Sequence, residues 1–184
     1  MKRAIAPVAL LTILALAGCT AEAPAPAPTP SASAPAVNPE SADEAVVPLA
    51  LEAITPEAVT AESTRLSDAV GTYVDPALVV GVDDQSQLTA ADGNAASYYA
   101  SFRTYTLTAD TAPAPIGVTL TNVLEASGWT IYETANQDGI FIAVLTIEVG
   151  GAAWFGIVQA DETVAGSPSV AFQLASPDLP ADEG

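Results

Sequence analysis

The stretch that decides the fold is residues 129–159, WTIYETANQDGIFIAVLTIEVGGAAWFGIVQ. It contains three runs rich in β-branched and aromatic residues, which favour strands. Asn136–Gly139 and Gly150-Gly151 separate the runs with turn residues, and glycine supplies the positive φ that tight hairpins need. Residues 129–133, 140–149 and 152–159 are therefore predicted to form an antiparallel meander.

The run Ile140–Leu145 inside this stretch is apolar at every position. A strand with one face in water alternates apolar and polar residues, so a run without alternation indicates burial on both faces. Either the predicted helices lie on opposite faces of the sheet, or another chain covers one face. A membrane span is excluded by the short length and by Glu133, Asp138 and Glu148 nearby.

Two helices are predicted upstream of the hairpins. Thr55 can cap the first helix, Pro56 suits its first turn, and Gly71 can end it. The second helix follows the chain-breaking Pro113 and Pro115 and ends at Gly128. It is indicated by apolar residues at helical spacing, which are Ile116, Leu120, Val123 and Leu124.

The rest of the chain completes a fold of the α+β class. We expect an antiparallel sheet of about four to five strands packed with two helices, in a single domain covering residues 49–176. Further strands are predicted at 98–108 and 169–174, and residues 77–82 are a strand or a buried extended segment. Polar loops are predicted at 83–94 and 160–168.

The N-terminus has the pattern of a secretory signal. Lys2 and Arg3 precede an apolar run from Ala4 to Ala17, which is too short for a membrane span. The run ends in Leu16-Ala17-Gly18-Cys19, which resembles the lipobox of bacterial lipoproteins. The resemblance implies that residues 1–18 are removed and that the Cys19 thiol carries a diacylglyceryl group. The alternative is an ordinary signal peptide followed by a chance cysteine.

Residues 19–48 are predicted to be a disordered tether rich in alanine and proline. Proline lacks an amide donor and disfavours both helix and sheet, and the segment has no aromatic residue to form a core. At about 3.1 Å per residue, roughly 28 residues of extended polyproline-like chain reach on the order of 80 Å. Such a spacer would hold the domain away from a membrane. Residues 177–184 are predicted to be a flexible acidic tail.

Composition narrows the possible functions. The 184 residues carry 22 acidic and four basic side chains, no histidine and one cysteine, and the formal net charge is −18. Removal of residues 1–18 with Lys2 and Arg3 lowers the side-chain charge to −20. A surface this negative repels nucleic acid. Without histidine there is no histidine base or imidazole ligand, and one cysteine forms no internal disulfide. We predict no cofactor and no bound metal.

Two acidic pairs are the candidates for chemistry. Asp83-Asp84 and Asp161-Glu162 could act as paired carboxylates, but adjacent acids on a loop usually point apart. Calcium would accept oxygen ligands from residues 83–87, yet the Asp-x-Asp-x-Asp-Gly spacing is missing. Solvated acidic loops are the simpler interpretation, so no catalytic residue is assigned.

Aromatic residues and Arg103 are the candidates for binding. The aromatic residues could line an apolar groove or a glycan platform, although core filling is more common on strands. Arg103 could hold an anionic ligand, but an ion pair with an acid on the sheet is favoured. The aromatic candidates are Tyr98, Tyr99, Tyr105, Trp129 and Trp154.

The order of these features is similar to that of small actinobacterial lipoproteins without an assigned activity. The lipobox, the Pro/Ala spacer, a helix ending in Gly128-Trp129 and a closing meander carry the resemblance. Relatives often end in Ser-Pro-Cys, whereas Asp178 follows Ser176-Pro177 here. We therefore expect a lipid-anchored, extracytoplasmic binding or accessory protein of the cell envelope, attached to the membrane through Cys19. The alternatives are an envelope hydrolase with paired carboxylates and an interaction module that dimerises through its apolar sheet.

Overall fold

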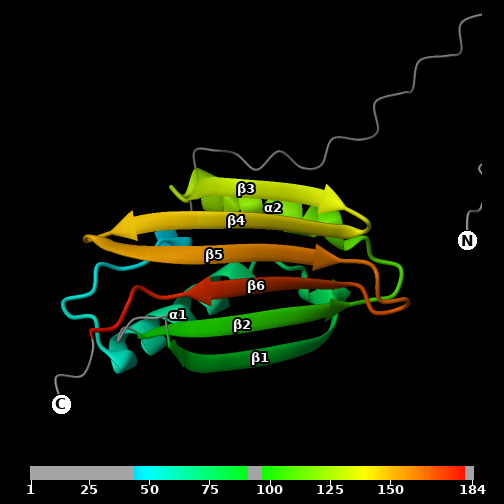
Figure 1. Cartoon of the computed structure of the whole chain (residues 1–184). Helices are drawn as coiled ribbons and strands as arrows, with labels where there is room; N and C mark the ends of the chain where they lie inside the picture. Colours follow the sequence, from blue (N-terminus) through cyan, green and yellow to red (C-terminus); the bar gives the residue numbers. More distant parts are fainter. Residues whose placement is uncertain (1–43, 91–96, 181–184) are drawn as a thin grey trace, which may run out of the picture. The chain divides into compact units, whose positions relative to one another are not determined.

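The computed structural model describes residues 44–90 and 97–180. They form one antiparallel sheet of six strands in the order β1-β2-β6-β5-β4-β3, together with two helices (Figure 1). The α+β class is thus confirmed, with more strands than the sequence indicated. The strands are β1 (Val79–Ala90), β2 (Ser97–Leu107), β3 (Thr130–Gln137), β4 (Ile140–Val149), β5 (Ala152–Asp161) and β6 (Ser169–Ala175); the helices are α1 (Pro56–Gly71) and α2 (Pro113–Ala126), with the short 3-10 turns η1 (Glu44–Val46) and η2 (Pro76–Leu78).

The meander from β3 to β6 follows the prediction. The two-residue turn Asp138-Gly139 joins β3 to β4, with φ values of 54° and 80°. Both residues lie in the left-handed region that this kind of hairpin turn requires. Gly150 and Gly151, at 61° and 80°, join β4 to β5 in the same way.

The loop predicted for residues 83–94 is wrong as far as the structure describes it. β1 continues to Ala90 because it pairs with β2 along its whole length, from Val79 opposite Leu107 to Ala90 opposite Ser97. Polar residues are tolerated here because β1 is an edge strand. β2 in turn pairs with β6, which places this hairpin beside the meander.

Both helices begin close to the predicted positions. The Thr55 side chain accepts a hydrogen bond of 3.2 Å from the amide of Ala58 at the start of α1. Pro113, which was expected to break the chain, is instead the first residue of α2. A proline is accommodated there because the first amides of a helix have no partner within it. Gly128, at φ 98°, follows the last turn of α2.

The two helices cover the same face of the sheet (Figure 1). Tyr105, Val170, Ala160 and Phe141 lie opposite one another in register across β2, β6, β5 and β4. α1 approaches this row through Gly71 above the Tyr105 hydroxyl, and α2 approaches it with a glycine above Phe141 and Ala160. The prediction that the helices could cover opposite faces is therefore wrong.

The strand β4 consequently has one buried and one partly exposed face. Phe141, Ala143 and Leu145 are buried beneath the helices. The alternating residues Ile140, Ile142 and Val144 are only partly buried. An uncovered apolar sheet face explains why the strand shows no alternation in sequence. That another chain covers this face stays a prediction.

The packed region extends beyond residues 49–176 at both ends. Val46 is 1% exposed, and its carbonyl accepts a 2.9 Å hydrogen bond from Trp129 Nε1–H. Leu179 is 3% exposed, and its amide donates to the carbonyl of Ser97 at 2.6 Å. Residues 44–48 and 177–179, at the predicted ends of the tether and the tail, therefore contact the domain. The signal segment, the lipobox and Cys19 lie outside the described residues.

Candidate functional site

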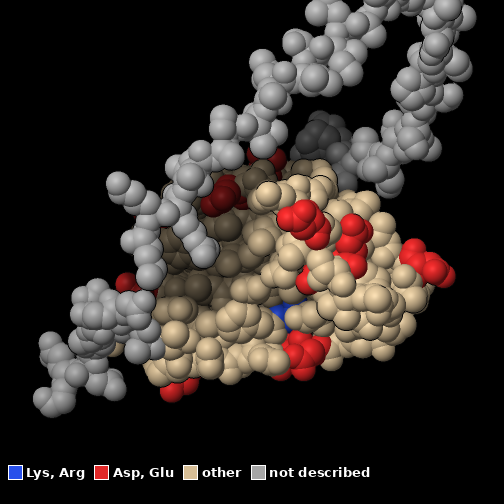
Figure 2. Space-filling model, turned by 45° about the vertical axis from the view of Figure 1, so that its right-hand side comes forward, with Lys and Arg blue, Asp and Glu red and all other residues tan. Residues whose placement is uncertain are grey.

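The sheet face away from the helices is the main unpartnered surface of the described residues. Its central row runs Val144, Ile157, Gln173 and Phe102 across β4, β5, β6 and β2, and it carries no charge. Figure 2 shows acidic side chains spread over the surface that it presents, with only a small basic area among them. The uncharged and mostly apolar central row can bind a ligand by contact.

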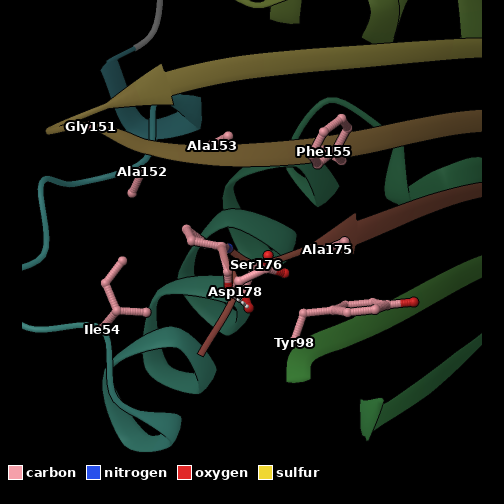
Figure 3. Close-up of a pocket in the computed structure, with 10 residues that line it drawn as sticks. Ile54, Tyr98, Gly151, Ala152, Ala153, Phe155, Ala175, Ser176 and Asp178 are labelled. Carbon is pink, nitrogen blue, oxygen red and sulfur yellow. Dashed lines mark hydrogen bonds between the residues drawn. The ribbon is translucent and has the colours of Figure 1, made fainter. Parts of the chain in front are cut away.

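A hollow of about 500 Å³ lies at the end of this face where β5 begins and β6 ends. Tyr98 and Phe155 project from β2 and β5 on either side of Ala175, and Asp178 lies between Tyr98 and Ile54 (Figure 3). Phe155 is 52% exposed. We call this site the open-face hollow. It combines two aromatic rings, an aliphatic wall and one carboxylate.

A smaller hollow of about 160 Å³ continues the site along the sheet. It shares Tyr98, Phe155 and Ala175 with the open-face hollow and adds Phe102 and Ile157. The two hollows together form an apolar groove that crosses β2, β6 and β5. Concave apolar sites with a few polar groups are typical of small-molecule binding.

The segment after β6 is fixed in place by polar contacts. The Ser176 hydroxyl accepts a 3.0 Å hydrogen bond from the amide of Tyr99 and donates to the carbonyl of Pro177 at 2.9 Å. Leu179 then anchors the chain against Ser97. These contacts hold Asp178, which is exposed, at the rim of the open-face hollow.

Arg103 forms ion pairs on the helix-covered side, as the sequence favoured. Its Nε donates to Asp84 at 2.5 Å and its Nη1 to Asp68 of α1 at 2.6 Å. Burial alone would lower the pKa of Arg103, but the hydrogen bonds that it donates to Asp84 and Asp68 outweigh this effect and raise the pKa above its usual value. Burial raises the pKa of the neighbouring Tyr105 phenol. The guanidinium therefore ties α1 to the β1–β2 hairpin.

Arg65 is held in a similar way at the start of the domain. Its guanidinium bonds both carboxylate oxygens of Glu62, at 2.5 and 2.8 Å, and the carbonyls of Ala45 and Val47 at 2.6 and 2.7 Å. The hydrogen bond to Glu62 raises the pKa of Arg65 despite partial burial. Both arginines of the described ranges thus serve in structural ion pairs.

Three of the four acids in the candidate pairs are held by hydrogen bonds to other side chains. Asp84 bonds Arg103 on the helix-covered face, whereas Asp83 alternates to the other face and accepts a bond from Gln85. Asp161 accepts bonds from the hydroxyl and amide of Thr163, which lower its pKa. Across residues 44–90 and 97–180, no group of three or more acidic or cysteine side chains is spaced to hold a metal ion.

A second, more polar hollow of about 270 Å³ lies between α1 and the β1–β2 hairpin. Ser67 and Ser101 line it, and within the described part of the chain their buried hydroxyl oxygens have no hydrogen-bond partner. Thr64 and the ion-paired Arg103 complete its polar wall.

The aromatic candidates divide between core and surface. Trp129 and Trp154 are 2% and 1% exposed and belong to the core, and Tyr105 packs there as well. Of the five aromatic candidates, only Tyr98 lines the open-face hollow. Sequence reasoning missed Phe155, although its position beside a core tryptophan on a strand places it on the other face.

No family model matches the chain, and a search of the curated proteins finds no match. No helix in the part of the chain that the structure describes is long and apolar enough to cross a membrane.

Proposed function

We propose that this chain is a lipid-anchored, extracytoplasmic binding protein of the cell envelope that contacts its ligand with the uncovered face of its sheet. The observation that supports binding is the open-face hollow, with its half-exposed Phe155. The anchor is supported by Leu16-Ala17-Gly18-Cys19 after a short apolar run. The resemblance to small actinobacterial lipoproteins is part of the same proposal.

Metabolic labelling with a clickable fatty acid tests the anchor. The wild-type chain is expected to incorporate the label and to sediment with membranes. Cys19→Ala removes the acceptor thiol and is expected to abolish both. Gly18→Ala keeps a small residue before the cysteine and serves as the matched control that retains labelling. An unlabelled wild-type chain, or a Cys19→Ala variant that stays with membranes, would reject the anchor.

Self-association through the same face is the second candidate. Ile142, Val144 and Ile157 are adjacent in the register and partly exposed, so a second copy could cover them. Sedimentation of the chain from Thr20 onward tests this idea, since that form lacks only the signal segment and Cys19. A monomer at all concentrations would reject dimerisation without affecting ligand binding.

The hydrolase alternative has less support. A carboxylate mechanism requires two acidic groups directed at one reacting bond. Asp83 and Asp84 lie on opposite faces of β1, and the Asp161 carboxylate is engaged by Thr163. Turnover assays on envelope glycans with Asp83→Asn and Asp161→Asn remain its direct test.

A further inference from the structure

We propose that the open-face hollow binds a small organic cation with an apolar body, such as an aryl- or alkylammonium ion. This inference rests on the binding function proposed above and names its ligand class. Three features of the hollow support it: two aromatic rings, an acid at the rim whose side chain has no partner among the described residues, and a surrounding surface on which the described residues place no cation outside an ion pair.

The aromatic rings provide the first part of the recognition. Tyr98 and Phe155 project from strands on either side of β6, with Ala175 between them (Figure 3). The small alanine leaves the space between the rings open. The face of an aromatic ring attracts a cation within roughly 6 Å through its quadrupole, and a desolvated site strengthens the attraction. The same rings cover an apolar body.

The acids provide the charge. Asp178 lines the hollow and is exposed, and no hydrogen bond or ion pair to its side chain is among those identified in the described ranges. Glu148 lies on the same sheet face, since it pairs in register with Ala153, another residue that lines the hollow. A ligand carboxylate would be repelled here, whereas a cation would be attracted.

The arginines do not offset this charge. Arg65 is bound by Glu62, and Arg103 is bound by Asp68 and Asp84. Neither arginine lines the open-face hollow or its smaller continuation. Within the described part of the chain, the charged side chains near the hollow are therefore acidic.

The size of the hollow limits the ligand. About 500 Å³ lies within the range of roughly 300–1,000 Å³ found for small-molecule sites. A single aromatic ring, which a cavity of roughly 150 Å³ already holds, or a short branched alkyl group fits within such a space and occupies part of it. The ammonium group would then sit between Asp178 and the aromatic rings, and the body would contact Ile54 and Ala153.

Three probes of matched size test the ligand class. The chain from Thr20 onward contains every described residue and is titrated with 2-phenylethylammonium, 2-phenylethanol and 3-phenylpropionate, with binding followed by NMR shifts. At low salt the cation is expected to bind about tenfold more tightly than the alcohol, with the carboxylate weakest. The advantage should shrink at high salt because ions screen Asp178.

Charge and ring variants locate the binding. Asp178→Asn is expected to remove most of the tenfold preference for the cation over the alcohol. Asp110→Asn makes the same charge change beyond the other end of β2 and should leave both affinities unchanged. Phe155→Leu keeps an apolar side chain without the ring and is expected to weaken cation binding about three- to tenfold. Tyr132→Leu removes a 79% exposed aromatic elsewhere and is its control.

The outcomes separate the two proposals. Equal binding of the cation and the alcohol, both weakened by Phe155→Leu, would overturn the cation class and leave the binding function standing. Absence of cation binding, or binding unchanged by Asp178→Asn and Phe155→Leu, would overturn the inference altogether. The labelling of Cys19 tests the anchor independently of either result.

Discussion

Removing residues 1–48, up to the domain boundary that the sequence suggests, is expected to destabilise the domain. The cut removes η1, and with it Val46, which is 1% exposed. It also removes the carbonyl that accepts the 2.9 Å hydrogen bond from Trp129 Nε1–H. Arg65 loses its two carbonyl partners at 2.6 and 2.7 Å as well. A chain that starts at Val37 keeps all of these contacts.

The expected magnitude follows from these contacts. Burial of a complete valine side chain contributes about 1.5 kcal/mol or more. A buried donor left without its acceptor costs about 1–3 kcal/mol, at the low end if water reaches Trp129. The partly exposed Arg65 contacts add little. The cut at residue 49 should therefore lower the free energy of unfolding by about 3 kcal/mol, a large part of the ~5–15 kcal/mol typical of a domain.

Urea denaturation followed by tryptophan fluorescence measures this difference. The chain from Leu49 is compared with the chain from Val37. In the longer chain, Val46→Ala removes two buried methyl groups and should cost about 1.6 kcal/mol. Leu49→Ala is the matched control, because this side chain is 57% exposed and should cost less than about 0.5 kcal/mol. Equal stability of the two chains would refute the reasoning.

Three further perturbations test the packing and the turns. Gly117→Ala places a Cβ 2.8 Å from Phe141 Cδ1. Thermal unfolding should show a net loss of stability of about 1–2 kcal/mol, because the clash outweighs the gain in helix propensity. No loss of stability would mean that α2 is not closely packed there. Burial raises the pKa of Tyr105, because the folded protein favours the neutral phenol over the phenolate. This preference adds to the free energy of unfolding below the unfolded pKa of about 10, and the contribution is lost as pH rises through the folded pKa. Wild-type stability should then fall in alkali more steeply than that of Tyr105→Phe, and parallel curves would contradict this. Gly139→Ala forces alanine to φ 80° and should cost about 1–2 kcal/mol in urea denaturation, whereas an unchanged midpoint would show that the turn relaxes.

The hairpins could be predicted because their signals are local. Asp138-Gly139 and Gly150-Gly151 have the residues that two-residue turns require, and β4 has its predicted bounds, Ile140–Val149. β1 could not be predicted to its full length, because its second half is polar. Its extended shape depends on pairing with β2, and Asp84 in particular is placed by Arg103 from the opposite strand.

The site was harder to predict than the fold. Trp154 and Phe155 are neighbours on β5, and only knowledge of the covered face tells which of them is core and which lines the hollow. Asp178 gave no signal, because its position depends on the hydrogen bond between Ser176 and the amide of Tyr99. A contact between residues so distant in sequence is set by tertiary structure alone.

The same distribution of charge connects the two proposals. The two arginines of the described ranges form ion pairs that stabilise the fold. The remaining acids are therefore not neutralised by them, and their charge affects ions and ligands in the solvent. An anionic membrane surface repels an acidic domain. A long tether from Cys19, as predicted, would keep the domain away from that surface. The same field raises the local concentration of cations around Asp178 and Glu148 and opposes anions. A cation reaching the open-face hollow would therefore meet a favourable field before it contacts Tyr98 or Phe155, and its association rate should fall with added salt more steeply than that of a neutral ligand of the same shape.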